Sequence, residues 1–259
     1  MGPAESIAPD WPAPPGVRAV FTVRTGGVSA PPFGTLNLAS HVGDAPEAVA
    51  ENRARLQARL QLPSEPFWLE QVHGCRVADL DREPGVPPVA DAAITHRPGR
   101  VCVVQVADCL PVLVCASDGS AIGAAHAGWR GLAGGVLEAT VRALRVPPRE
   151  LLAWLGPAIG QACFEVGADV HRALTCGDPG AGSALLENAR GRWQCDLYGL
   201  ARRRLAALGV NQVYGGGWCT YSDPRRFFSY RRDGRCGRMA ALIWLAPRPS
   251  SAGTSGALG

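Results

Sequence analysis

The feature that most constrains the fold is a group of three apolar runs in the middle of the chain. They cover residues 101–106, 110–116 and 121–127, and the turn-forming residues Ser117-Asp118-Gly119-Ser120 separate the last two. Short apolar runs bounded by turn residues predict strands, and an Asp-Gly pair between them predicts a hairpin. We therefore expect residues 110–127 to form a β-hairpin, preceded by a further strand at 101–106.

The hairpin brings together two residues of types that bind metals. If the turn centres on Asp118-Gly119, counting outward places His126 opposite Pro111. Cys109 is two residues from Pro111 and so lies on the face of His126, where diagonal neighbours are roughly 7–8 Å apart. A one-residue change in the loop would reverse this relationship. The register therefore predicts that the side chains of Cys109 and His126 converge.

A third candidate ligand, His73, lies far upstream in residues 71–74 (QVHG), and only the fold can bring it to the other two. Each residue alone has an ordinary explanation, since a cysteine in an apolar strand is usually a small core residue. Together, two imidazoles and one thiolate suit zinc. Three protein ligands leave one tetrahedral position open, which is typical of catalytic zinc sites. The sequence thus predicts a metalloenzyme with His73, Cys109 and His126 as ligands.

The remaining pattern predicts a mixture of helices and strands. We expect a helix from Asp44, as its cap, to residue 60, a second at 132–144, and a third at 197–208 that is capped by Asp196 and closed by Gly209. Further strands are predicted at 17–23, 68–71, 92–95, 152–155, 213–215 and 239–244. Hairpins mixed with helices at irregular intervals favour an α+β fold, here a single domain of mixed β-sheets flanked by helices.

Length and composition agree with one domain. A chain of 259 residues with 47% apolar content can bury a large core, and no linker divides it. We expect a catalytic domain over residues 16–247, a flexible N-terminal segment at 1–15 and a flexible C-terminal tail at 248–259. There is no apolar run of 18 residues, no recognisable signal peptide and no Cys-x-x-Cys pair among nine cysteines. These features predict a cytoplasmic protein with reduced thiols and no membrane partner.

The charged residues exclude some classes of function. The formal net charge is +4 and the chain contains no Lys, so Schiff-base chemistry is excluded. Residues 202–204 and 225–232 are rich in Arg, and the second run adds aromatic residues. The modest charge and the absence of a known RNA-binding motif nevertheless predict no nucleic-acid partner.

Eight motifs resemble those of one protein family. They are residues 36–38 (LNL), 41–44 (HVGD), 68–74 (WLEQVHG), 107–112 (ADCLPV), 125–131 (AHAGWRG), 154–160 (WLGPAIG), 164–167 (FEVG) and 227–232 (FFSYRR). In order and spacing, from about Val20 to about Leu245, they resemble the laccase-domain family, also called the polyphenol oxidase or peptidoglycan editing factor family. Its members are described as purine nucleoside phosphorylases with adenosine deaminase and methylthioadenosine phosphorylase activity. The resemblance implies metal binding by the three residues above and a fold shared with bacterial deamidase toxins.

Four further residues are candidates for the site. Arg130 precedes the helix expected at 132, and a guanidinium beside a helix N-terminus suits phosphate. Arg24, in residues 22–27 (TVRTGG), is a second phosphate candidate, with a surface charge before a Gly turn as its alternative. His41 is a candidate acid or base, or a residue that orients its loop. Asp108 adjoins the Cys ligand and is a candidate hydrogen-bond partner for a ligating His or for water.

Together these features predict a zinc-dependent purine nucleoside phosphorylase with adenosine deaminase activity. The expected substrates are adenosine, inosine and methylthioadenosine, with inorganic phosphate as co-substrate. Metal-activated water would attack the purine C6, and phosphate near Arg130 would attack the ribose C1′.

Three alternatives remain open at this point. The first is a copper-dependent polyphenol oxidase, although five histidines without a His-x-His pair are few for several coppers; copper can also replace zinc in the same site. The second is a metal-free cysteine hydrolase with Cys109 as nucleophile and His126 as base. The third is a non-enzymatic role, such as binding a cell-wall enzyme or a metabolite.

Overall fold

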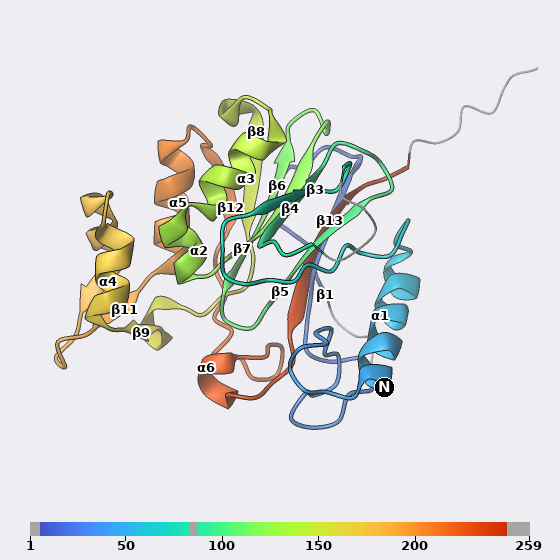
Figure 1. The fold of residues 1–259 in the computed structure, drawn as a ribbon, viewed down its shortest axis with the longest axis horizontal. Helices are drawn as coiled ribbons and strands as arrows, with labels where there is room; N and C mark the ends of the chain where they lie inside the picture. The colour runs from blue at the N-terminus through green and yellow to red at the C-terminus, as the bar shows by residue number, and fades with distance from the viewer. Residues whose placement is uncertain (1–5, 83–87, 248–259) are drawn as a thin grey trace, which may run out of the picture.

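The computed structural model describes residues 6–82 and 88–247, in three sheets and several helices (Figure 1). The strands are β1 (Ser6–Ile7), β2 (Val17–Thr22), β3 (Val77–Asp79), β4 (Ala92–Thr95), β5 (Val101–Val106), β6 (Leu110–Ala116), β7 (Ile122–Ala127), β8 (Leu151–Leu155), β9 (Glu165–Val166), β10 (Leu185–Glu187), β11 (Trp193–Cys195), β12 (Gln212–Gly215) and β13 (Met239–Leu245). The α-helices are α1 (Pro46–Leu60), α2 (Trp129–Gly134), α3 (Val136–Leu144), α4 (Ala168–Thr175), α5 (Leu197–Ala207) and α6 (Tyr230–Asp233). Short 3-10 helices are η1 (Pro148–Glu150), η2 (Gln161–Cys163) and η3 (Pro179–Ala184).

The two larger sheets pack face to face. One has the antiparallel order β1-β2-β13-β5, and the other has the mixed order β12-β8-β6-β7-β4-β3. A small third sheet has the order β10-β11-β9. In Figure 1, α2, α3 and α5 lie together on one side of the sheets and α1 lies on the opposite side. This arrangement confirms the predicted single α+β domain.

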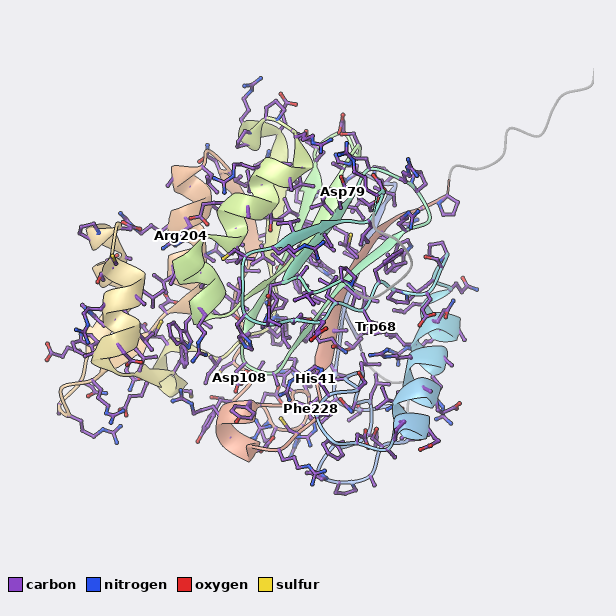
Figure 2. The ribbon with its side chains drawn as sticks, viewed as in Figure 1. His41, Trp68, Asp79, Asp108, Arg204 and Phe228 are labelled. Carbon is purple, nitrogen blue, oxygen red and sulfur yellow. The ribbon has the colours of Figure 1, made fainter. Side chains whose placement is uncertain are left out.

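The alternation of side chains along the strands explains the layers. In β6, Val112 and Val114 pack in the cluster that contains α3 and α5, whereas Leu113 faces the other sheet. In β13, Leu242 packs in the cluster that contains Leu56 of α1, while its neighbours face between the sheets. Both faces of these strands are buried, which is why the sequence reads as continuous apolar runs. Side chains fill the space between the layers (Figure 2).

The predicted hairpin is present with the predicted register. β6 and β7 are antiparallel neighbours, and Pro111 is opposite His126. The strand before them, β5, instead pairs with β13 in the other sheet. The chain therefore crosses from one sheet to the other through residues 107–109. Asp108 has a left-handed backbone there, with φ 87°, and Cys109 lies at the crossing point.

Three local predictions were wrong. The helix expected at 132–144 begins at Trp129 and is broken at Gly135, which has φ 95° and separates α2 from α3. Asp44 does not cap α1, because its carboxylate instead accepts hydrogen bonds from Ser29 and Asn37 and so joins two loops. Residues 68–71 form no regular strand, since Glu70 makes only an isolated pairing with Val89.

Residues 6–15 of the N-terminal segment contact the rest of the domain. β1 pairs with β2, and the Asp10 carboxylate accepts a hydrogen bond of 2.9 Å from the indole of Trp154. Ile7 and Trp11 supply apolar surface that packs on the core between the sheets, and this contact holds residues 6–15 in place. The expected flexibility of residues 1–5 and 248–259 concerns residues outside the part of the chain that the structure describes. Within the described part, no helix is long and apolar enough to cross a bilayer.

Candidate metal centre

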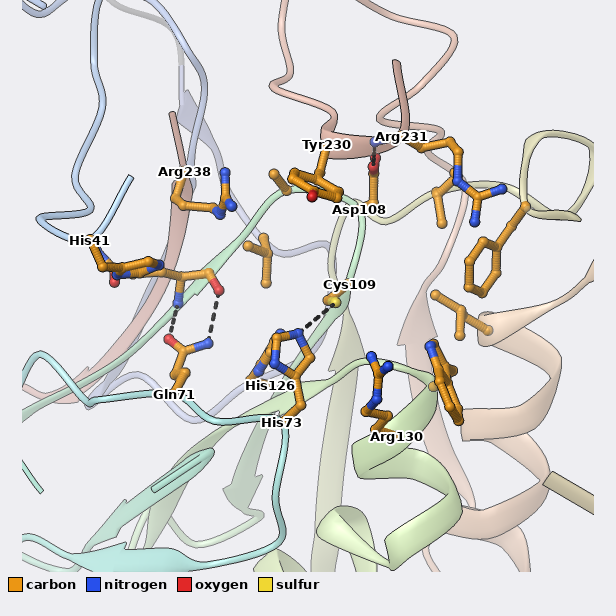
Figure 3. Close-up of a pocket in the computed structure, with 17 residues that line it drawn as sticks. His41, Gln71, His73, Asp108, Cys109, His126, Arg130, Tyr230, Arg231 and Arg238 are labelled. Carbon is orange, nitrogen blue, oxygen red and sulfur yellow. Dashed lines mark hydrogen bonds between the residues drawn. The ribbon is translucent and has the colours of Figure 1, made fainter. Parts of the chain in front are cut away.

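The structure brings His73, Cys109 and His126 together from three separate segments (Figure 3). Their candidate ligand atoms all lie within 4.8 Å of one another. Cys109 Sγ is 4.0 Å from His73 Nε2, and the two imidazole rings lie edge to face with centroids 4.8 Å apart. Among residues 6–82 and 88–247, this is the single group of three or more His, Cys, Asp or Glu side chains placed to hold an ion.

A buried carboxylate, Asp91, positions two of the three side chains. Its Oδ1 lies 2.8 Å from His126 Nδ1 and accepts the backbone N–H of His73 at 2.9 Å. Its Oδ2 accepts the N–H groups of Val72 and Gly74. These bonds hold the loop that gives His73 its left-handed backbone, with φ 62°. A carboxylate behind a ligating histidine fixes the ring and its tautomer in metal sites.

The approach of the segments requires a glycine at position 128, at the start of α2. A Cβ added to Gly128 would lie 2.8 Å from Cys109 Sγ and 3.6 Å from the ring of His73. Carbon and sulfur cannot approach so closely without a shift, so a larger residue would displace the thiol. The motif glycine therefore makes space for the side chains of Cys109 and His73.

The local electrostatics favour a thiolate. Burial opposes ionisation of Cys109, but the charge on His126 and hydrogen bonds from His126 and His73 outweigh it and lower its pKa to about 6. Burial likewise opposes protonation of His126, yet the Cys109 thiolate and the Asp91 carboxylate raise its pKa to about 9. The two residues thus form a thiolate–imidazolium pair. Metal binding would release the imidazolium proton, because metals bind neutral imidazole.

The three side chains lie in a pocket of about 570 Å³. The pocket is lined by His41, Gln71, His73, Gln105, Val106, Ala107, Asp108, Cys109, His126, Trp129, Arg130, Ile159, Phe164, Leu197, Tyr230, Arg231 and Arg238. Three guanidinium groups, those of Arg130, Arg231 and Arg238, face this space (Figure 3). Asp108 is the one residue with a carboxylate among those that line the pocket, and that carboxylate is already engaged in hydrogen bonds. The pocket therefore suits an anion beside an apolar ring.

Asp108 lines the pocket but contacts no candidate ligand through its carboxylate. The carboxylate accepts hydrogen bonds from the hydroxyls of Thr220 and Ser229 and from the backbone N–H of Arg231. Asp108 therefore connects the crossing between the sheets to the segment that leads into α6. The carboxylate that accepts the expected hydrogen bond from a candidate ligand histidine is Asp91 instead.

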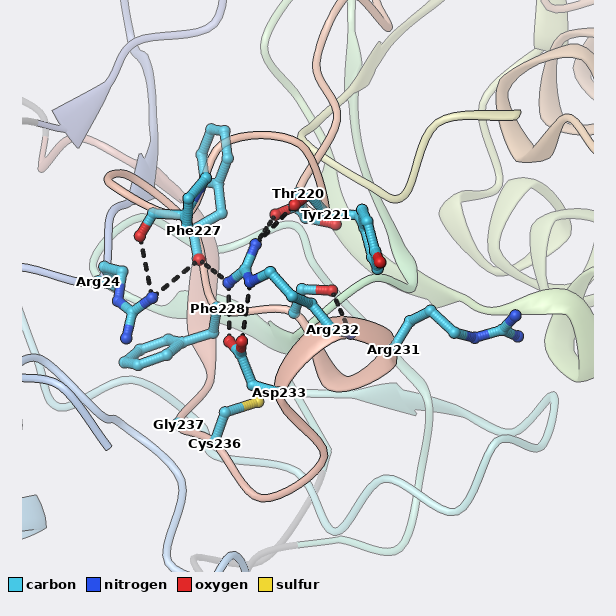
Figure 4. Close-up of polar contacts among 12 residues, drawn as sticks. Arg24, Thr220, Tyr221, Phe227, Phe228, Arg231, Arg232, Asp233, Cys236 and Gly237 are labelled. Carbon is cyan, nitrogen blue, oxygen red and sulfur yellow. Dashed lines mark hydrogen bonds and ion pairs between the residues drawn. The ribbon is translucent and has the colours of Figure 1, made fainter. Parts of the chain in front are cut away.

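The two predicted phosphate residues have different surroundings. Arg24 is absent from the pocket wall, because its guanidinium donates to the carbonyls of Pro224 and Phe227 and stacks on Phe228 (Figure 4). Arg130 lines the pocket, where its guanidinium lies 4.4 Å from the centroid of the Trp129 ring. It is in the first turn of α2 and not ahead of the helix, since α2 begins at Trp129.

His41 stands at the exposed rim of the pocket. Partial burial lowers its pKa, and the positive charges of Arg238 and Arg53 lower it further. The imidazole is therefore neutral at pH 7 and able to accept a proton.

Sequence reasoning missed Asp91, Arg231 and Arg238. Arg231 lies in the recognised motif 227–232, so a signal was present. Arg238 immediately precedes β13 and Asp91 immediately precedes β4. Polar residues at strand ends are common, so neither position was distinctive without the fold.

The comparisons with known proteins cover nearly the whole chain. Residues 18–246 match the family described as multi-copper polyphenol oxidoreductase laccase. Purine nucleoside phosphorylase YfiH of Escherichia coli (strain K12) is 52% identical over 239 residues, 92% of this chain and 98% of that protein. Purine nucleoside phosphorylase PA4543 of Pseudomonas aeruginosa is 54% identical over 240 residues, with the same two shares. The crystal structure of Neisseria meningitidis protein NMB0706 matches with a TM-score of 0.91 and 48% identity, over 93% of this chain and 99% of that one.

Proposed function

Since this chain belongs to the family described as multi-copper polyphenol oxidoreductase laccase, we propose that it is a zinc-dependent purine nucleoside phosphorylase with adenosine deaminase activity. The names of its relatives support a purine nucleoside phosphorylase. The proposed substrates are adenosine, inosine and methylthioadenosine, with inorganic phosphate as co-substrate. We place the catalytic unit in residues 16–247. The observation that carries the proposal is the convergence of two imidazoles and a thiol within a basic pocket.

The donor set fits zinc. Two nitrogen donors and one thiolate are ligands that zinc prefers, and the three side chains that would hold it line the pocket. The hydrogen bond that the His126 imidazole donates to the Asp91 carboxylate is the kind of outer contact that metal sites use. When bound, zinc would supply a Lewis-acid centre that polarises an oxygen of water or substrate.

The basic wall supports binding of the phosphate co-substrate. In phosphorolysis, a phosphate oxygen bonds to the ribose C1′ while the bond from C1′ to the purine nitrogen breaks. The proton that phosphate loses goes to the departing base, which gives free base and the sugar 1-phosphate. Arg130, Arg231 and Arg238 supply guanidinium groups around one cavity, and guanidinium pairs well with phosphate oxygens. Among the described residues, Arg130 has no carboxylate partner, so its charge is available to a bound anion.

His41 and the apolar part of the wall have complementary roles in this proposal. His41 is neutral near pH 7 and would take up a proton from a substrate hydroxyl or from water. Trp129, Phe164 and Tyr230 offer aromatic surface for the purine and sugar. Deamination replaces the C6 amino group of adenosine with oxygen from water and releases ammonia.

The test combines metal analysis with nucleoside assays. Purified wild type, Cys109→Ala and a control, Cys176→Ala, whose cysteine is exposed and outside the pocket, would be incubated with each nucleoside with and without phosphate. We expect near-stoichiometric zinc and phosphate-dependent release of free base in the wild type and the control, and loss of both in Cys109→Ala. A zinc-free wild type that releases no base would overturn the proposal.

One specific observation favours a second candidate, a cysteine hydrolase. The Cys109 sulfur and a ring nitrogen of His126 lie within 4.8 Å of each other. The lowered pKa of Cys109 and the raised pKa of His126 favour a thiolate beside an imidazolium, which is also the arrangement of a nucleophile and its acid–base partner. This candidate predicts rapid alkylation of Cys109 by iodoacetamide in the protein as purified, with hydrolytic activity that chelators do not affect. Stoichiometric copper together with phenol oxidation would instead indicate the activity for which the family is described.

We also propose a cytoplasmic location. All nine cysteines are free thiols in the structure, which supports a reducing compartment.

A further inference from the structure

Two thiols and one hydroxyl form a cluster outside the three candidate metal ligands. Cys163 ends η2, and Cys219 and Ser222 lie in the segment between β12 and α6. The Ser222 hydroxyl oxygen lies 3.3 Å from Cys219 Sγ and 3.4 Å from Cys163 Sγ. One small side chain therefore contacts both sulfur atoms, which come from positions 56 residues apart in the sequence.

Backbone contacts hold the two segments together. The N–H of Gly160 donates to Cys219 Sγ at 3.2 Å, and the carbonyl of Gly160 accepts from the N–H of Cys163 at 3.0 Å. Ala158 forms an isolated parallel bridge with Cys219. A Cβ added to Gly160 would lie 3.2 Å from Cys219 Sγ. Both cysteines are thus anchored around the same glycine.

The cluster differs chemically from the other cysteines outside the metal centre. Burial opposes ionisation of Cys219, but hydrogen bonds from Ser222, from the Gly160 N–H and from Cys163 outweigh it and lower its pKa. Burial raises the pKa of the other shifted thiols, which are Cys75, Cys102, Cys115, Cys195 and Cys236. Cys163 and Cys219 are both partly exposed. Reactive cysteines combine thiolate character with access for the oxidant.

We propose that Cys163 and Cys219 form a redox-active dithiol that a hydroperoxide converts to a disulfide. The Cys219 sulfur attacks the terminal peroxide oxygen, the O–O bond breaks, and the peroxide leaves as an alcohol or, from hydrogen peroxide, as water. Cys219 is then a sulfenic acid. The Cys163 sulfur attacks this sulfur, the S–O bond breaks, and water leaves with the thiol proton. The two cysteines together lose two electrons, which the peroxide gains.

The disulfide would connect two parts of the pocket wall. η2 lies between Ile159 and Phe164, which both line the pocket. Thr220, next to Cys219, donates to Asp108 at the crossing between the sheets. A disulfide brings its sulfurs to about 2.05 Å, so the contacts of the two sulfurs with the Ser222 hydroxyl must rearrange when it forms.

Peptide mapping under non-reducing conditions tests the proposal on the full-length protein. The protein as purified would be treated with hydrogen peroxide, blocked with an alkylating reagent and digested with trypsin, which cuts after Arg. Peptides 150–172 and 205–225 each contain one cysteine, Cys163 and Cys219 respectively. We expect one linked species of these two peptides, two hydrogens lighter than their sum, that disappears on treatment with dithiothreitol.

Three variants complete the test. Cys163→Ser should lose the link but retain Cys219 as a sulfenic acid that dimedone traps, and Cys219→Ser should lose both. Cys176→Ser, which removes an exposed cysteine away from the cluster, should keep the link at the wild-type yield. A wild type in which these peptides remain unlinked while Cys176 is oxidised, or in which Cys219 links mainly to another cysteine, would overturn the proposal.

Discussion

The Asp91 carboxylate and the His126 imidazole are joined by a hydrogen bond of 2.8 Å, and their side chains are 1% and 4% exposed. The same carboxylate accepts three consecutive backbone N–H groups around His73. One side chain therefore orients the ring of one candidate ligand and the backbone of another. With a proton on Nδ1 toward Asp91, His126 presents Nε2 to the centre of the group.

Asp91→Asn should reduce the affinity for metal by more than it reduces the stability of the fold. The amide keeps one acceptor oxygen but loses the charge that holds the imidazole and the 72–74 loop. We expect metal affinity to fall by about 10- to 100-fold, as for other changes behind metal ligands. Competition with a zinc chelator measures this. The control is Asp118→Asn, at the exposed hairpin turn, where the carboxylate accepts the backbone N–H of Ser120. Equal zinc affinities for Asp91→Asn and wild type would contradict the assigned role.

Gly128→Ala should expel Cys109 from its position. The backbone at Gly128 has φ −65°, which alanine adopts freely, so the effect would come from the contact between the new Cβ and the sulfur. We expect loss of bound zinc and a stability loss of about 1–3 kcal/mol from overpacking. Gly217→Ala is the control, because its Cβ meets nothing within 4 Å. Metal analysis and thermal unfolding would be compared for both, and a Gly128→Ala protein with full zinc would contradict the steric argument.

The sequence predicts the parts of the site that depend only on the register of one hairpin. The hairpin turn fixes which residues face each other, so the approach of Cys109 and His126 followed from counting. Asp91 could not be found in this way. It reaches His126 because β4 pairs with β7, and pairing between strands so far apart in sequence has no local signal.

Competing local interactions explain the other differences. Asp44 has the sequence features of a helix cap, but two loop side chains compete for its carboxylate. Gly135 reads as one more small residue in a helix, and only its positive φ shows that it ends α2. The apolar run 101–106 predicts a strand but not the sheet to which it belongs, because both large sheets contain strands that are buried on both faces.

Asp81 should make stability depend on pH in acid. Burial opposes its ionisation, but hydrogen bonds from the Thr95 hydroxyl and the His96 N–H outweigh it and lower its pKa. The unfolded chain then binds more protons than the folded one as the pH falls below about 4, so this stabilisation is present above that pH and is lost below it.

Asp81→Asn tests this sign. At pH 7 the free energy of unfolding of the variant should be about 1.5–3 kcal/mol lower than that of wild type, the usual contribution of hydrogen bonds to a charged group, and the difference should shrink toward pH 3. Urea unfolding at several pH values measures it, with the exposed Glu187→Gln as control. A difference that stays constant from pH 7 to pH 3 would show that ionisation of Asp81 is not its source.

Arg130→Ala should specifically impair use of phosphate. A guanidinium that donates to a phosphate oxygen contributes about 1.5–3 kcal/mol, so we expect KM for phosphate to rise by about tenfold or more, since 1.4 kcal/mol corresponds to tenfold. Zinc content and KM for the nucleoside should change little, because Arg130 contacts neither Asp91 nor the three candidate ligands through a hydrogen bond. Arg149→Ala, which removes a guanidinium that is 78% exposed, controls for the loss of charge. If KM for phosphate stays at the wild-type value while zinc is retained, the anion is bound by Arg231 and Arg238 on the opposite part of the wall, and Arg130 serves to cover Trp129.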